Sequence, residues 1–216
     1  MSLITLKNIK KEYGKNQVLF ENLSLEIEKG EFVGLVGKSG AGKTTLLNII
    51  GLITDISEGT ITIDGHQNLS MNGKNAMILR RYTIGYLFQN YGLIEDESVL
   101  RNLKLALEYK KIKREEKLKL INKYLKQFEL SDMLNKKVYQ LSGGEQQRIA
   151  IIKLILQGSQ IILADEPTSG LDKENELIVM KLLKELNEKG ITIIMVTHNM
   201  NLCDCFSRVI NVENFR

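Results

Sequence analysis

Two kinds of hydrophobic pattern alternate along the chain. L-S-L-E-I-E (23–28) and T-I-T-I-D-G (60–65) place apolar residues at every second position, which is typical of strands in a sheet with one solvated face. F-V-G-L-V-G (32–37), I-I-L-A-D (161–165) and I-T-I-I-M-V-T (191–197) are nearly continuous apolar segments, as in strands buried on both faces of a parallel sheet. The chain is therefore expected to combine antiparallel and parallel sheets.

Helical periodicity fills the middle of the chain. Apolar residues recur every four positions in one set, Val99, Leu103 and Leu107. They recur every three or four positions in a second set: Leu118, Ile121, Leu125 and Phe128. Both spacings place apolar side chains on one face of a helix. We therefore predict that residues from about 90 to 157 are mainly helical and form an insertion.

A further helix is predicted between the last two buried segments. Asp172 is a good N-cap for a helix over 173–188, and Gly190 suits a left-handed position just beyond its end. The order strand, helix, strand from 161 to 197 then makes a βαβ unit.

Length and composition are those of an ordinary globular protein. The 216 residues suffice for one compact unit with a subdomain, and 43% of them are hydrophobic. No apolar run approaches the roughly 20 residues that span a bilayer, and residues 1–11 lack the hydrophobic region of a signal peptide. We therefore expect a cytoplasmic protein. Cys203 and Cys205 have the spacing of neither a redox motif nor a zinc site, so we interpret both as reduced structural thiols.

The positive charge is mild and concentrated in one stretch. The formal net charge of +4 is too small by itself to indicate nucleic-acid binding. Three Glu residues stand in the helical stretch that holds much of the basic excess: Lys104, Lys110, Lys111, Lys113, Arg114, Lys117, Lys119, Lys123 and Lys126. A solvated helix face explains this stretch better than an acidic partner or lipid headgroups.

A glycine-rich motif follows the first buried strand. G-K-S-G-A-G-K-T, residues 37–44, opens the helical segment K-T-T-L-L-N-I-I, which is the context of a phosphate-binding loop. Three glycines allow backbone N–H groups to converge on phosphate oxygens at the helix N-terminus: Gly37, Gly40 and Gly42. In this motif Lys43 reaches the β- and γ-phosphates and Thr44 binds Mg²⁺. A simple Gly-rich turn is the weaker alternative.

Two adjacent carboxylates, Asp165 and Glu166, end another buried strand. In such a position they need a cation or hydrogen-bond donors to offset the loss of water. Mg²⁺, held by Thr44 and by Asp165 directly or through water, is the expected cation. Glu166 points to the opposite side and is placed to orient or deprotonate an attacking water. Alone, such a pair is more often a capped loop; beside a phosphate-binding loop we favour catalysis.

A second Gly-containing turn before a helix indicates which class of nucleotide-binding protein the chain resembles. L-S-G-G-E-Q-Q-R, residues 141–148, matches the signature motif of the ABC transporter ATPases without a departure. Other motifs match that family in order: Tyr13, Gln89 in Y-L-F-Q-N (the Q-loop), S-G-L-D at 169–172 (the D-loop) and His198 in V-T-H. Over its whole length the chain resembles the ATPase subunits of ABC transporters.

The resemblance implies a fold and its division. The fold is α/β: a P-loop NTPase (RecA-like) core with a mainly parallel sheet, an N-terminal antiparallel β subdomain and an inserted α-helical subdomain. The single ABC ATPase domain, 1–216, would divide into a core of 1–89 and 158–216 and a helical signature subdomain of 90–157.

The resemblance also implies a set of site residues. Tyr13 is expected to stack on adenine, and the remaining ATP contacts are expected from Gly37, Lys38, Ser39, Gly40, Ala41, Gly42, Lys43, Thr44, Thr45, Gln89, Ser142, Gly143, Gly144, Glu145 and Asp172. The expected Mg²⁺ ligands are Thr44, Gln89 and Asp165, and the expected catalytic residues are Lys43, Glu166 and His198. Simpler alternatives remain for three of them: Gln89 as polar surface, His198 as a core histidine and Asp172 as a helix cap.

Two partners follow from the resemblance. In the family the signature of one subunit closes over the P-loop of another, so two ATP molecules are sandwiched in a head-to-tail dimer. The segment Y-G-L-I-E-D-E (91–97) after Gln89 is where the family meets an integral membrane permease. We thus expect a homodimer with ATP and Mg²⁺, attached through its permease to the inner face of the cell membrane, without nucleic acid.

Shorter motifs indicate a branch of the family. I-I-G-L and R-R-Y-T-I-G-Y-L-F-Q-N-Y-G-L-I resemble the macrolide-export and lipoprotein-release branch, and N-Y-G-L-I-E-D-E is similar to bacteriocin exporters of the lactococcin type. The expected function is ATP-driven export or mechanotransmission of a peptide, lipoprotein or drug. D-I-S-E-G (55–59) departs from the branch, where many relatives carry a proline.

Two other classes of function compete with transport. Soluble ABC proteins acting on DNA or ribosomes usually add long coiled coils, zinc-binding cysteines or a second ATPase half, which this sequence lacks. A regulatory ATPase module of a cell-wall or division complex could use the same residues.

Overall fold

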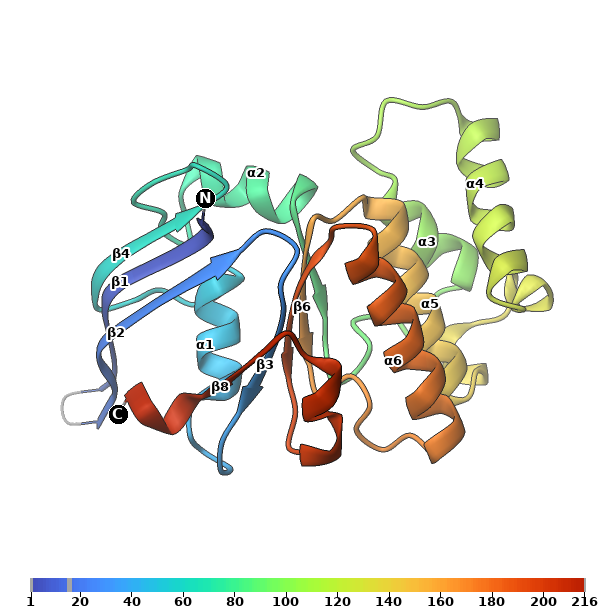
Figure 1. Cartoon of the computed structure of the whole chain (residues 1–216). Coiled ribbons are helices and arrows are strands. Elements are labelled where there is room, and N and C mark those ends of the chain that lie inside the picture. The colour runs from blue at the N-terminus through green and yellow to red at the C-terminus, as the bar shows by residue number, and fades with distance from the viewer. Residues whose placement is uncertain (1, 15–16, 216) are drawn as a thin grey trace.

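Two sheets organise the molecule, as a computed structural model describing residues 2–14 and 17–215 shows (Figure 1). The antiparallel sheet has the order β2-β1-β4 and consists of β1 (Ser2–Tyr13), β2 (Gln17–Glu28) and β4 (Glu58–Ile63). The parallel sheet has the order β5-β6-β7-β3-β8 and consists of β3 (Phe32–Val36), β5 (Ile84–Leu87), β6 (Ile161–Asp165), β7 (Thr192–Val196) and β8 (Arg208–Asn211). The expected combination of antiparallel and parallel sheets is confirmed.

The antiparallel sheet buries one face. Along β2 the buried residues Leu23, Leu25 and Ile27 alternate with exposed ones, as the period-two pattern predicts. The pattern did not indicate β1, because register shifts on both sides of Ile9 interrupt its alternation. The expected strand 60–65 ends earlier, at Ile63, since the chain turns there with positive φ at the next two residues.

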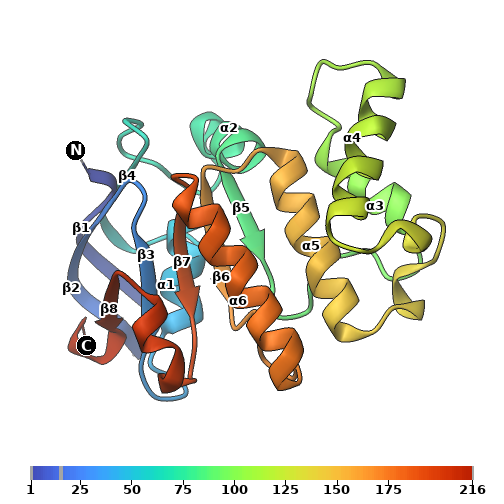
Figure 2. The same ribbon diagram turned by 45° about the vertical axis from the view of Figure 1, so that its right-hand side comes forward.

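The parallel sheet is covered on both faces, which explains its continuous apolar strands. Helix α1 (Lys43–Ile50) lies between the two sheets, while α5 (Gly143–Gln157) and α6 (Lys173–Glu188) cover the opposite face (Figures 1 and 2). Within β6, Leu163 packs with the α1 side, and its neighbours Ile162 and Ala164 pack with the α5 and α6 side. Each strand therefore contributes to two hydrophobic cores.

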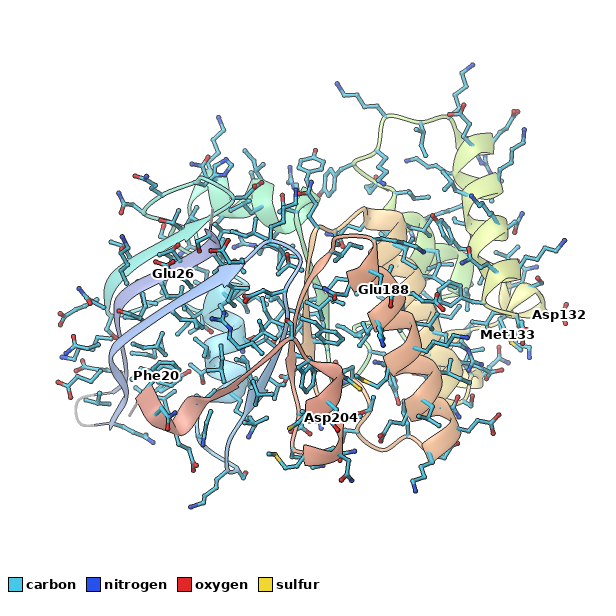
Figure 3. All side chains as sticks on the ribbon, viewed as in Figure 1. Phe20, Glu26, Asp132, Met133, Glu188 and Asp204 are labelled. Atoms are coloured by element: carbon cyan, nitrogen blue, oxygen red, sulfur yellow. The ribbon has the colours of Figure 1, made fainter. Side chains whose placement is uncertain are left out.

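The predicted helical insertion is present. It contains α3 (Val99–Ala106), α4 (Arg114–Gln127), α5 and two short 3₁₀ turns. The predicted apolar face of α4 is buried at Ile121, Leu125 and Phe128, whereas Leu118 is half-buried. The side chains on the other face of α4 project outward at the edge of the molecule (Figure 3), and most of the basic residues there are exposed. This agrees with a solvated helix face.

Helix α6 confirms the prediction made for residues 173–188. Asp172 caps it, because its carboxylate accepts a hydrogen bond from the Asn175 backbone N–H at 2.8 Å. Gly190 follows the helix with a φ of 87°, the left-handed conformation that glycine adopts most easily.

Some elements gave no pattern from which to predict them. Helix α2 (Lys74–Tyr82) buries only Ala76 and Leu79, and β8 buries only Ile210. Elements this short and this exposed have too few apolar positions to show a period.

Two further expectations concern the thiols and the membrane. Cys203 and Cys205 are free, as predicted; Cys203 is half-buried and Cys205 is exposed. Among residues 2–14 and 17–215, no helix combines the length and the apolarity that crossing a membrane requires.

Candidate nucleotide-binding site

The loop of residues 37–44 joins β3 to α1 and opens toward solvent. Gly42 is the N-cap of α1 with a φ of 97°, and a Cβ there would meet the Phe20 ring at 2.7 Å. Glycine is thus required both by the backbone and by the packing of β2 beneath the loop. The first backbone N–H groups of α1 face the loop, where an anion would satisfy them.

Lys43 places its ammonium group inside this loop. Lys43 is only 9% exposed. Its Nζ donates to the carbonyl oxygens of Gly37 at 2.8 Å and Lys38 at 3.0 Å. Both acceptors are neutral carbonyl groups, so these two hydrogen bonds do not neutralise the ammonium charge. Such a charge next to free N–H groups favours a phosphate.

Thr44 and Asp165 join α1 to the end of β6. Thr44 Oγ1 donates to Asp165 Oδ1 at 3.1 Å. Burial raises the pKa of Asp165, and the nearby Glu166 adds to this, while the Thr44 hydrogen bond and the Lys43 charge oppose it. The Thr44 hydrogen bond and the Lys43 charge therefore do not fully offset the burial of the Asp165 carboxylate.

These two oxygen donors fit Mg²⁺. A hydroxyl and a carboxylate are hard ligands of the kind that Mg²⁺ binds, usually with its other positions taken by phosphates and water. No cluster of three or more His, Cys, Asp or Glu residues that could hold a metal occurs in the described part of the chain. A Mg²⁺ ion at this place would take further ligands from a bound phosphate and from water.

Glu166 and His198 form a second pair of polar groups. His198 Nδ1 and Glu166 Oε2 are 3.1 Å apart, and the side chains are exposed by 67% and 24%. Glu166 has a positive φ of 46°, and its backbone N–H bonds to the carbonyl of Val196 at the end of β7. His198 is exposed, so the alternative of a core histidine is wrong.

A cleft of about 500 Å³ is lined by Lys43, Thr44, Glu166 and His198, whereas Asp165 does not line it and contacts it through its hydrogen bond with Thr44. Tyr13, 45% exposed at the end of β1, lies on its rim, with its hydroxyl 3.3 Å from Thr45 Oγ1. The residues that line the cleft are Tyr13, Gln17, Leu19, Gly37, Ser39, Gly40, Gly42, Lys43, Thr44, Thr45, Glu166 and His198. Gln17 and Leu19 were not predicted, because the alternating pattern of β2 begins only at residue 23; the V-L-F run before it was the available signal.

Other predicted residues lie away from this cleft. Lys38 is exposed and contributes its carbonyl to Lys43, and Ala41 is buried under the loop. Gln89 is exposed and does not line the cleft. It lies two residues beyond Leu87, the last residue of β5 and the last one paired with β6. Asp172 caps α6, as one of its two readings supposed.

The signature residues form a separate helix start. Ser142 caps α5: its Oγ accepts from the Glu145 N–H at 3.3 Å, and the Glu145 carboxylate accepts from the Ser142 N–H at 2.7 Å. Burial raises the pKa of Glu145, but the hydrogen bonds that the Ser142 N–H and hydroxyl donate to its carboxylate, with the Lys136 and Arg148 charges, outweigh it and hold that pKa below its usual range. Residues 142–145 do not line the cleft. Helices α1 and α5 begin on the same edge of the molecule, apart from one another (Figure 1).

The fold and the cleft together define a P-loop nucleotide-binding domain of the α/β class. The sequence matches the family described as "ABC transporter" over residues 20–169. The chain therefore belongs to the ABC transporter family and is an ABC ATPase domain, as the motifs predicted.

The chain is similar to proteins of bacteria and archaea. It is 42% identical over 212 residues to the macrolide export ATP-binding/permease protein MacB of Campylobacter jejuni, covering 98% of this chain and 33% of MacB. It is 40% identical over 215 residues to the uncharacterized ABC transporter ATP-binding protein MJ1508 of Methanocaldococcus jannaschii, covering 98% of this chain and 96% of that protein. The chain thus spans about a third of the length of MacB, and its resemblance to macrolide-export proteins is confirmed.

A solved structure supports the same fold. The dimeric ATP-binding cassette MJ0796, bound to ADP and Pi in a post-hydrolysis state, aligns with a TM-score of 0.87 and 38% identity over 96% of this chain and 93% of that one. The predicted fold class is confirmed. The resemblance to lactococcin-type exporters stays a prediction.

Proposed function

We propose that two copies of this chain bind and hydrolyse two molecules of ATP at composite sites, each made from the P-loop of one copy and the signature of the other. One observation carries the proposal: a single copy holds two glycine-containing helix starts, those of α1 and α5, and the second does not line the cleft of the first. The ABC relative with ADP and Pi is a dimer. Two-fold symmetry would place each signature over the opposite P-loop.

Within one composite site the residues have separate tasks. Lys43 binds the β- and γ-phosphates, and Thr44 and Asp165 would hold Mg²⁺, which would neutralise the developing phosphate charge. Glu166 accepts a proton from the attacking water or orients it, and His198 fixes the Glu166 carboxylate at 3.1 Å and faces the γ-phosphate. Tyr13 stacks on the base, and Ser142, Gly143 and Gly144 donate to the γ-phosphate of the partner's ATP.

We further propose the division of the chain that the motifs imply: a core of 1–89 and 158–216 and a helical unit of 90–157. Gln89 stands at their junction, exposed between β5 and the insertion. From there it can reach Mg²⁺ or the attacking water once the helical unit moves toward the core.

The partner in the membrane is proposed to bind at the segment 91–97. Within this segment Ile94 is 49% exposed, and Phe88, just before the segment, is 40% exposed. Exposed apolar side chains beside the helical unit suit a permease segment. MacB is named as an ATP-binding/permease protein for macrolide export. We therefore propose that this chain works on the cytoplasmic face of a membrane and powers export or mechanotransmission of a drug, peptide or lipoprotein.

Complementation between two inactive variants tests the composite site. Lys43→Ala removes the phosphate-binding cation, and Ser142→Arg blocks the signature. In a mixed dimer, one site has both its P-loop and its signature intact. ATP turnover of the mixture is expected to rise well above that of either variant alone. A mixture that stays as inactive as its components would contradict the composite site.

A further inference from the structure

A chain of hydrogen bonds connects the signature helix to the start of α6. Arg148 Nη1 on α5 donates to Asn175 Oδ1 at 3.1 Å. Asn175 Nδ2 donates to Asp172 Oδ2 at 2.9 Å, and the Asn175 backbone N–H donates to Asp172 Oδ1 at 2.8 Å. Asn175 therefore uses the oxygen of its carboxamide toward the signature helix and the nitrogen toward the D-loop.

The packing around Gly144 is a second, independent observation. A Cβ placed on Gly144 would overlap Asn175 Oδ1. Gly144 lies in the regular first turn of α5 and is buried, so space, and not an unusual backbone conformation, requires glycine here. The carboxamide of Asn175 fills the volume that a side chain of the signature motif would occupy.

The side chain of Arg148 is half-buried, and its charge also acts on the Glu145 carboxylate. Its Nε atom is buried and has no hydrogen-bond partner within residues 2–14 and 17–215. Removal of Asn175 would leave Nη1 without its acceptor as well. An unsatisfied buried charged group is costly, so the signature helix would be expected to shift.

We propose that Asn175 is a positioning residue that holds the D-loop (169–172) and residues 142–145 of the signature motif in one fixed arrangement. Both segments would then meet the partner copy together. The proposal rests on the head-to-tail dimer proposed above. Helices α5 and α6 both begin on the edge of the molecule at which α1 begins (Figure 1). Asn175 connects the starts of α5 and α6, which do not line the copy's own cleft.

A set of four variants tests this assignment in a Glu166→Gln background, which is expected to keep ATP bound. They are Asn175→Ala, Gly144→Ala, the double variant with both changes, and Asn122→Ala as a control on the exposed face of α4. ATP-dependent dimerisation is measured by analytical ultracentrifugation. ATP affinity of the monomer is measured with a fluorescent analogue at low protein concentration.

Asn175→Ala is expected to weaken dimerisation about tenfold or more, because two hydrogen bonds are lost, while monomer affinity for ATP stays that of the control. Gly144→Ala is expected to weaken it further, because the new methyl group meets the carboxamide. In the double variant the carboxamide is gone, so dimerisation is expected to return to the level of Asn175→Ala alone. Dimerisation of Asn175→Ala equal to the control, or a double variant no better than Gly144→Ala, would overturn the proposal.

Hydrogen exchange of the single copies separates this proposal from the dimer itself. Peptides covering 142–148 and 168–176 are expected to exchange roughly tenfold faster in Asn175→Ala than in Asn122→Ala. If the Glu166→Gln parent failed to dimerise with ATP, the dimer would be refuted, and the exchange rates would still decide about Asn175. Unchanged exchange in both peptides would refute the link between them.

Discussion

At the scale of single residues, opposite charges meet at the P-loop. Lys43 brings a buried ammonium to carbonyl oxygens of the loop, and Asp165 brings a half-buried carboxylate to Thr44. Neither group is fully compensated by the chain itself. A phosphate and a divalent cation would compensate both at once, which is why the two motifs belong to one site.

Lys43→Ala should weaken ATP binding about ten- to a hundredfold, because charge-assisted hydrogen bonds to phosphate are lost. Isothermal titration calorimetry measures the affinity. Lys74→Ala is a matched control, since Lys74 is also the first residue of a helix capped by glycine but lies on α2. Equal affinity in both variants would remove Lys43 from its assigned role.

The raised pKa of Asp165 predicts that the stability of the folded chain depends on pH. Its pKa is raised above the usual 3.8, mainly by burial. A raised folded-state pKa means that the contribution of this group to stability is greatest below 3.8 and is lost as the pH rises through the window just above that value. At neutral pH the ionised Asp165 therefore costs stability.

Asp165→Asn should accordingly stabilise the chain slightly against urea at pH 7 when nucleotide and Mg²⁺ are left out, and it should lose ATP turnover. At a pH below 3.8 the difference in stability should vanish, because both side chains are then neutral. Urea unfolding at several pH values measures this. A variant that is less stable than the parent at pH 7 would show that Asp165 is already compensated within the chain.

At the scale of elements, sequence patterns predicted the strands and helices that contain many apolar positions. The buried strands β3, β6 and β7, the helix α6 and the helical insertion have enough apolar positions to show their period. Helix α2 and strand β8 have too few, and bulges obscure β1. The phosphate-binding loop was predictable because its glycines and Lys43 act within one short turn.

Ser142→Arg is a prediction about the start of α5. It should abolish ATP turnover and leave ATP binding to the isolated copy unchanged, because residue 142 does not line that copy's cleft. Ser98→Arg is the matched control: Ser98 caps α3 in the same way, accepting from a backbone N–H at 3.2 Å. Both variants lose a cap worth about 1 kcal/mol. Equal turnover in the two would show that the signature has no role beyond capping.

At the scale of the whole molecule, contacts between distant segments decide what the site contains. Residue patterns alone could not place Tyr13 beside Thr45, because that contact depends on how the bulged strand β1 runs past the P-loop. Nor could they show that Asn175 occupies the space beside Gly144. Family motifs supplied the names of site residues, and the structure supplies their grouping into a cleft and a separate helix start.

We propose that ATP joins two copies of this chain through the P-loop of one and the signature of the other. Replacing Glu166 by Gln should slow hydrolysis at least about a hundredfold, because the proton acceptor is lost, and should leave ATP bound. Light scattering then gives the mass of the Glu166→Gln variant with ATP and Mg²⁺, with ADP and Mg²⁺, and with ATP after the further change Ser142→Arg. The account predicts twice the mass of one copy with ATP, and the mass of one copy in the other two cases. A single copy with saturating ATP, or a dimer that persists with Ser142→Arg, would contradict it.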